Sequence, residues 1–254
     1  MRKQIAAILV IIMALCHFVP AKATALGNET LHYVISYKWG LVHKDAGEAT
    51  LSLRSHGSNY QAVLTAKTKP WADKIFQVRD TLRATMTVRE LRPTRYEKIS
   101  HEGGKYNRDI ITYTYSGGTI KANVHRTKVR NGKTKVTRKN FSTKYEAYDM
   151  LSIFYFLRTY DYSRLPKGRS IRRVIFSGSH AEFITIRNLG QQTLKLRSGK
   201  KVTALHLRFN FTDDGGKTSS ANMDTWISTK APYVPYQLEG ELPVGKVKCY
   251  LIDR

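Results

Sequence analysis

The stretch Ile110–Tyr115 reads Ile-Ile-Thr-Tyr-Thr-Tyr and is followed at once by Ser116-Gly117-Gly118. Its β-branched and aromatic residues alternate between apolar and polar types, which is the pattern of a half-buried strand. Two consecutive glycines supply the positive φ angles that a tight hairpin turn needs. The stretch therefore predicts a strand that ends in a hairpin turn.

The same pattern recurs through most of the chain, with turn signals at Gly103-Gly104, Asn131-Gly132 and Gly215-Gly216. The other alternating runs are His32–Trp39, Ala49–Arg54, Gln61–Ala66, Leu82–Val88, Arg173–Phe176, Phe183–Arg187, Thr203–Phe211 and Val247–Ile252. Short alternating runs separated by turns are typical of antiparallel sheets. We expect a mainly β fold, a curved antiparallel sheet or half-open barrel.

One segment breaks this period and predicts a helix over residues 144–158. Thr143 and Glu146 have the spacing of a capping box. The following residues lack glycine and proline, and Met150–Leu157 is apolar on nearly every side. We therefore expect a buried helix, wrapped by the sheet, with Phe154 and Leu157 in the core.

Residues 1–23 have the order of a cleavable secretory signal. Arg2 and Lys3 precede an apolar run, Ile5–Cys16, and small residues follow at Ala21 and Ala23. The run is shorter than the roughly 20 residues of a transmembrane helix, and no later run matches it. We expect a mature chain without a transmembrane segment that begins between residues 24 and 26, carries no lipid on Cys16, and forms one β-rich domain over 24–254.

The expected mature chain is strongly basic. The full sequence has a formal charge of +24, and loss of three cations and no acid with the signal leaves +21. Cys249 is then the only cysteine, so no internal disulfide is possible. Charge alone predicts nonspecific binding to nucleic acid in vitro, but an exported protein would not meet chromosomal DNA, and we expect no specific nucleic-acid partner.

The basic residues concentrate in one predicted hairpin. Nine of them and no acid lie between residues 121 and 144: Lys121, Arg126, Lys128, Arg130, Lys133, Lys135, Arg138, Lys139 and Lys144. A two-residue turn at Asn131-Gly132 places Arg130 opposite Lys133 and Lys128 opposite Lys135, where like charges repel. A solvated edge hairpin would tolerate this arrangement, and an anionic partner would make it favourable. Both interpretations remain open.

Three separated stretches resemble a bacterial protein family of unknown function, DUF3108. They are Tyr37 to Leu51 with Ala46-Gly47-Glu48, Tyr148 to Arg158 with Tyr148-Asp149-Met150-Leu151-Ser152, and Trp226 to Val247 with Pro235-Tyr236. The resemblance implies an exported, mostly antiparallel β envelope protein, and it implies no known activity. By architecture alone, the expected fold is similar to periplasmic lipoprotein carriers, whose curved sheet wraps a helix around an apolar cavity.

No catalytic motif, nucleotide-binding loop or metal-ligand spacing is present in the sequence. We expect no catalytic residue, metal or cofactor. Cys249 lies in an alternating run and is expected to be a buried apolar residue. Asp149 and Arg158 are expected to pair with backbone or with an opposite charge at the helix ends. Trp39 and Trp226 are candidates to flank a ligand, although strand tryptophans more often belong to the core or rim.

The sequence favours a noncatalytic exported protein of the periplasm or cell envelope. Its expected partner is an anionic or amphiphilic lipid, glycolipid or glycan, with Lys128, Arg130, Lys133, Lys135, Trp39 and Trp226 as candidate ligand-binding residues. One alternative is an enzyme acting on an envelope glycan or lipid through Glu48 and Asp149. Another is a structural partner of an envelope protein. An apolar cavity would favour binding, converging carboxylates would favour an enzyme, and a flat apolar patch would favour a structural role.

Overall fold

A computed structural model describes residues 26–213, 216–218, 222–241 and 245–252 of the chain, with the side chain of Val42 excepted. The expected signal segment 1–23, with Cys16, lies outside the described residues, as does Gly215 of one expected turn.

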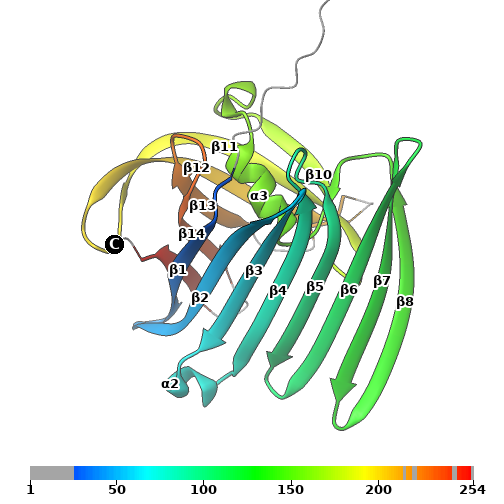
Figure 1. The fold of residues 1–254 in the computed structure, drawn as a ribbon. Helices are drawn as coiled ribbons and strands as arrows, with labels where there is room; N and C mark the ends of the chain where they lie inside the picture. The colour runs from blue at the N-terminus through cyan, green and yellow to red at the C-terminus, as the bar shows by residue number, and fades with distance from the viewer. Residues whose placement is uncertain (1–25, 214–215, 219–221, 242–244, 253–254) are drawn as a thin grey trace, which may run out of the picture.

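The first half of the chain is a meander of eight antiparallel strands (Figure 1). These are β1 (Glu29–Trp39), β2 (Val42–His56), β3 (Asn59–Thr68), β4 (Val78–Thr87), β5 (Pro93–Glu102), β6 (Lys105–Ser116), β7 (Thr119–Arg130) and β8 (Lys133–Thr143). A short helix, α2 (Pro70–Asp73), lies between β3 and β4. The expected turns at Gly103-Gly104, Gly117-Gly118 and Asn131-Gly132 are confirmed, each with two positive φ angles.

The second half contains α3 (Ser152–Thr159), a 3-10 turn (Tyr162–Arg164) and further strands. The strands are β9 (Ala147–Tyr148), β10 (Ser170–Phe176), β11 (Ala181–Lys195), β12 (Lys201–Thr212), β13 (Met223–Ser228), β14 (Pro235–Glu241) and β15 (Lys246–Leu251).

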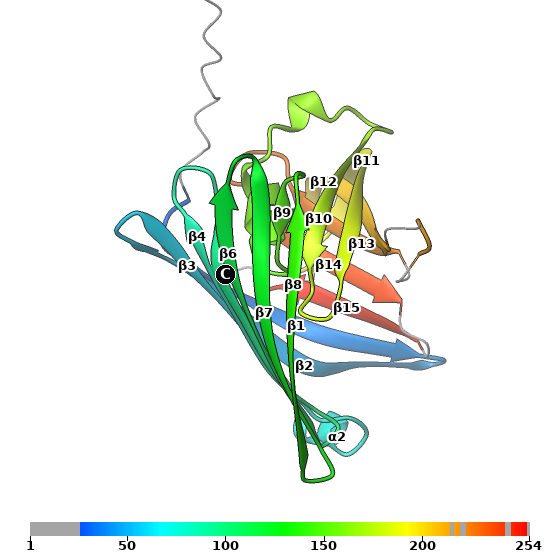
Figure 2. The same ribbon diagram turned by 90° about the vertical axis from the view of Figure 1, so that its right-hand side faces the viewer.

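All fifteen strands form one sheet in the order β8-β7-β6-β5-β4-β3-β2-β1-β15-β14-β13-β12-β11-β10-β9. Only the β9–β10 pair is parallel among the described pairs. The sheet curls into a nearly closed, barrel-like shape (Figures 1 and 2). Because β1 pairs with β15, the first and last strands of the chain lie at the centre of the sheet. The predicted mainly β class is confirmed.

The interior contains two apolar clusters. One is built mainly from β1–β8 and includes Leu151 and Tyr155. The other is built mainly from β10–β13 and includes Ile153 and Leu157. The segment from Leu151 to Leu157 therefore supplies different side chains to the two clusters.

The predicted bounds of the helix are wrong. Residue 143 ends β8, residues 147–148 form β9, and α3 begins only at Ser152. Thr143 does not cap a helix, since its Oγ1 accepts a hydrogen bond from the N–H of Tyr145, and Glu146 pairs with Arg173. Leu157 is buried as expected, whereas Phe154 is only half-buried.

Within the described residues, no helix combines the length and apolar character that a membrane crossing requires.

Candidate functional site

The basic hairpin has the predicted register. Arg130 pairs with Lys133 and Lys128 pairs with Lys135 across β7 and β8. Asn131 and Gly132 form the turn, with φ angles of 50° and 72°. Like charges are therefore direct neighbours, as expected.

The side chains of this hairpin alternate between two faces of the sheet. Ala122 and Val124 of β7 are buried in the apolar interior. Lys128 and Arg130 lie an even number of residues further along β7, so they project from the same, inner face. Their partners on β8 share that face, because directly paired residues lie on one side of a sheet.

The inner face carries two adjacent rows of polar residues across β5 to β8, and the second row extends to β4. One row pairs Lys98 with Asp109, Asp109 with Arg126, and Arg126 with Thr137. The next pairs Asp80, Ser100, Asn107, Lys128 and Lys135 in succession. The interior is thus apolar at one end of these strands and charged toward the other.

An acid lies beside the basic residues, although none occurs in the sequence between residues 121 and 144. Asp109 on β6 is 2% exposed, and its Oδ1 lies 2.9 Å from Nε of Arg126. Burial raises the pKa of Asp109 above its ordinary value, and Arg126 opposes that rise. The neighbouring strand supplies this acid, so a count within the hairpin alone does not include it.

The turn between β10 and β11, residues 177–180, closes over this charged surface. Lys139 of β8 donates a hydrogen bond from Nζ to the carbonyl of Ser179, at 2.9 Å. Gly178, with φ of 86°, lies so close to Asp109 that an added Cβ atom would be 2.7 Å from Oδ2. Only a residue without a side chain fits this approach.

A groove of about 330 Å³ remains between the turn and the hairpin. Its cationic lining comes from Arg126, Lys128, Lys135 and Lys139, and His180 completes the rim. The pKa of Lys128 lies below its ordinary value, first because of Arg126 and then because of burial and Arg130. Cations crowded in this way favour a bound anion.

The four hairpin residues named from the sequence divide into two pairs. Lys128 and Lys135 line the groove. Arg130 instead donates hydrogen bonds to the carbonyl of Tyr106 at 2.9 Å and to Oδ1 of Asn107 at 2.9 Å. Lys133 is exposed beside the turn and is not part of the groove lining.

Arg126, Lys139 and His180 were not named as ligand-binding candidates. The strand period could have identified the first two, because Arg126 lies two residues before Lys128 and Lys139 pairs with Val124. No local signal points to His180, which reaches the groove from a different hairpin.

An apolar cavity of about 150 Å³ lies between α3 and strands β11 to β14. Ile153, Phe154 and Leu157 line it from α3, and Phe209, Phe211 and Ile227 are among the residues opposite. A cavity of about this volume accommodates a group such as benzene. It is too small for a whole acyl chain.

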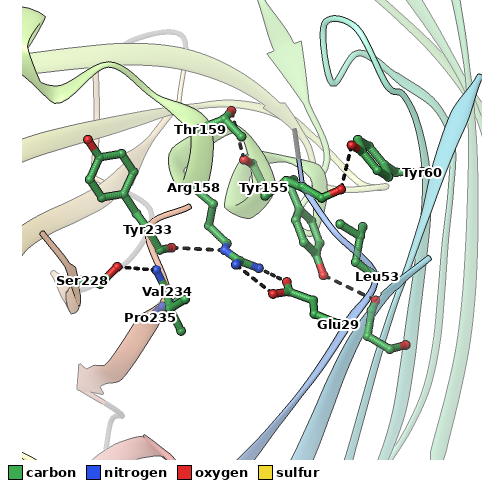
Figure 3. Close-up of polar contacts among 12 residues, drawn as sticks. Glu29, Leu53, Tyr60, Tyr155, Arg158, Thr159, Ser228, Tyr233, Val234 and Pro235 are labelled. Carbon is green, nitrogen blue, oxygen red and sulfur yellow. Dashed lines mark hydrogen bonds and ion pairs between the residues drawn. The ribbon is translucent and has the colours of Figure 1, made fainter. Parts of the chain in front are cut away.

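Arg158 forms part of the wall of this cavity and is 1% exposed. Its guanidinium forms a two-point ion pair with Glu29 of β1, and its Nε donates to the carbonyl of Tyr233 at 3.1 Å (Figure 3). The N–H of Tyr233 donates back to the carbonyl of Arg158 at 3.0 Å. The expectation that Arg158 pairs with backbone and an opposite charge is confirmed.

The carboxylates proposed for catalysis do not converge. Glu48 is exposed and lies 2.8 Å from Nζ of Lys67. Asp149 is fully buried and accepts hydrogen bonds from the N–H groups of Leu151 and Ser152. Burial raises the pKa of the Cys249 thiol to about 11, which leaves little thiolate at neutral pH. Among the described residues, no three His, Cys, Asp or Glu side chains gather as metal ligands would.

The two candidate tryptophans lie apart from the groove and the apolar cavity. Trp39 ends β1 and is 58% exposed. Trp226 lies on the face of β13 opposite Thr225 and Ile227, which line the cavity. Its ring stacks on His206 with centroids 4.5 Å apart. The structure therefore does not bring Trp39 or Trp226 to the basic residues.

The family profile described as Protein of unknown function (DUF3108) matches residues 32–252. The chain belongs to the DUF3108 family. None of the curated proteins matches this DUF3108 chain. A crystal structure of a beta-barrel-like protein of domain of unknown function DUF1849 from Brucella abortus is similar to it in fold, with a TM-score of 0.60 and 9% identity. The similarity covers 90% of the DUF3108 chain and 97% of the Brucella chain.

Proposed function

We propose that this DUF3108 protein is a noncatalytic, exported protein of the periplasm or cell envelope that binds an anionic ligand in the groove between β7–β8 and the β10–β11 turn. The ligand is a phosphate- or carboxylate-bearing lipid, glycolipid or glycan. In this proposal the sheet wraps α3, whose residues pack into both apolar clusters.

The observation that carries the proposal is the convergence of four cationic side chains on one groove. Asp109 lies beneath them and pairs with Arg126, so Lys128, Lys135 and Lys139 supply the positive charge available to a ligand. Lys128 and Lys135 face each other across the hairpin, so an anion between them would replace a repulsion with two attractions. Arginine and lysine together bind phosphate and carboxylate groups through charge-assisted hydrogen bonds.

The volumes of the two cavities support recognition of the charged part of a ligand. The apolar cavity of about 150 Å³ cannot hold an acyl chain, whereas the basic groove of about 330 Å³ has room for a headgroup or a sugar unit. Recognition therefore rests on the charged part of the ligand. The enzyme alternative has less support, because Glu48 is on the exposed surface and Asp149 binds the backbone at the start of α3.

The test is a pair of charge-matched variants on the same two strands. Lys128→Glu with Lys135→Glu reverses two groove cations. Lys121→Glu with Arg138→Glu makes the same change in net charge on the opposite face, since neither shares the face of Val124. Binding of inorganic pyrophosphate and of a uronic-acid oligosaccharide is measured by calorimetry at low salt, with folding of each variant checked by circular dichroism.

We expect the groove variant to lose affinity by about tenfold or more, which corresponds to about 1.4 kcal/mol, while the outer-face variant stays within about threefold of the wild type. Binding should weaken as salt is raised, because the Debye length falls from about 10 Å at 0.1 M to about 3 Å at 1 M. Equal losses of affinity in both variants would show that binding depends on overall charge and would contradict binding in the groove. Failure of the wild type to bind either probe would contradict the proposed function.

A further inference from the structure

One end of the sheet concentrates exposed apolar side chains. The connections of an antiparallel meander alternate between the two ends of the sheet. The connections β1–β2, β3–β4, β5–β6 and β7–β8 therefore all lie at this end (Figure 1). Four large apolar residues at two of these connections, β1–β2 and β3–β4, are exposed: Trp39 by 58%, Leu41 by 106%, Ile75 by 73% and Phe76 by 53%. We call these four residues and the connections that carry them the apolar rim.

The apolar rim is held in place by contacts that leave these side chains outside. Trp71 of α2 donates a hydrogen bond from Nε1 to the carbonyl of Asp45 on β2, at 2.9 Å. The ring of Phe76 lies against Gly103 of the β5–β6 turn, and the N–H of Gly103 donates to the carbonyl of Gln77 at 2.9 Å. The connection through α2 is therefore fixed to its neighbours on both sides.

The same end of the sheet is positively charged. Its exposed lysines include Lys38, Lys44, Lys74, Lys105 and Lys133, and Lys246 beside Lys38 pairs with Glu241. The acids at this end have cationic partners within ion-pair distance: Asp45 with Arg197, Asp73 with Arg79, and Glu102 with Lys98. Apolar tips among lysines match the headgroup region of an anionic bilayer, where tryptophan and phenylalanine are buried and lysines meet lipid phosphates.

We propose that the apolar rim docks this protein on the surface of an anionic lipid bilayer, with Leu41 and Ile75 inserted among the headgroups. A bilayer fits better than a folded protein because the apolar residues stand on two connections, Trp39 and Leu41 at β1–β2 and Ile75 and Phe76 between α2 and β4, with exposed lysines among them. Fluid lipid can receive both connections and pair its phosphates with the lysines, whereas a protein partner would need one rigid complementary surface. This proposal is independent of the anion groove.

The test compares two double variants of the full chain. Leu41→Ser with Ile75→Ser removes the two most exposed side chains of the apolar rim. Tyr145→Ser with Ile252→Ser is the matched control, since these residues are 68% and 47% exposed and follow the ends of β8 and β15, away from the rim. Partitioning is measured by cosedimentation with phosphatidylglycerol–phosphatidylcholine vesicles and with pure phosphatidylcholine vesicles. Insertion is measured by quenching of tryptophan fluorescence with brominated acyl chains.

We expect the wild type and the control to bind the anionic vesicles, and brominated lipid to quench their tryptophan fluorescence. The rim variant should bind these vesicles at least about tenfold more weakly. The proposal would be overturned if the rim variant bound the anionic vesicles as well as the wild type does. It would also be overturned if the wild type did not bind them. Self-association that the rim substitutions abolish, without vesicle binding, would assign the surface to a second copy and also overturn it. Pyrophosphate calorimetry separates the two proposals, because the rim variant should retain groove binding.

Discussion

Asp149 caps the start of α3 through hydrogen bonds with Leu151 and Ser152. Its Oδ1 accepts from the N–H of Leu151 at 2.9 Å and of Ser152 at 2.8 Å, while Oγ of Ser152 accepts from the N–H of Asp149 at 2.9 Å. This reciprocal arrangement satisfies backbone donors that would otherwise be buried without partners. The Asp149 to Ser152 part of the family motif therefore has a structural explanation.

The burial of Asp149 makes a testable contribution to the pH dependence of stability. Burial raises the pKa of Asp149 from 3.8 to about 6, against the opposing hydrogen bonds from the backbone. Between these two pH values the folded state holds a proton that the unfolded state has lost, so stability falls as pH rises. Asp149→Asn cannot titrate at this position and should not lose this stability. Its unfolding free energy relative to that of the wild type should therefore rise by up to roughly 3 kcal/mol between pH 4 and pH 7.

The measurement is urea unfolding of both proteins across this pH range. Asp161→Asn is a suitable control, because Asp161 accepts a comparable backbone hydrogen bond from Ser163 but is exposed, and its pKa is lowered. Parallel curves of unfolding free energy against pH for the wild type and Asp149→Asn would contradict a raised pKa for Asp149.

At the scale of elements, α3 links the two apolar clusters through unequally buried side chains. Leu157 is 9% exposed and belongs to one cluster. Phe154 packs against the other cluster but is only half-buried and lines the apolar cavity. Leu157→Ala should therefore cost about 2–5 kcal/mol of unfolding free energy. Phe154→Ala should cost less than Leu157→Ala, although a fully buried phenylalanine would cost about 3–5 kcal/mol. Denaturant unfolding of both variants checks this order, and a larger loss for Phe154→Ala would contradict it.

The elements that the sequence predicted well are those specified by local chemistry. The stretch Ile110–Tyr115 lies in β6, and Asn131-Gly132 sets the register of the basic hairpin. The start of α3 was misjudged because Thr143 and Glu146 have capping spacing, whereas Thr143 ends β8 and Glu146 precedes β9 and pairs with Arg173.

The groove itself could not be predicted from local chemistry. It depends on contacts between distant segments, such as Lys139 with Ser179 and Gly178 with Asp109. The sequence identified the cationic strand residues but not the turn that makes a site of them. Nor did it show that an acid from the next strand lies beneath.

At the scale of the whole molecule, the order of strands predicts a gradient of local stability. β1 lies in the middle of the fifteen-strand order with β15 beside it, and β8 and β9 lie at the two edges. Backbone amides in the centre of a sheet open less often than those at its edges. Hydrogen exchange should therefore be slowest in β1 and β15 and fastest in β8 and β9. Faster exchange in β1 than in β8 would contradict this prediction.

The pairing of β1 with β15 also bears on the order in which the chain can fold during synthesis. The meander from β1 to β8 involves only residues that emerge first, so it can begin to form early. Its β1 edge then stays unpaired until residues 246–251 have been made, because only these residues complete that ladder. Release of a nascent chain before this point would leave a long strand edge open to other chains, which is a route to aggregation.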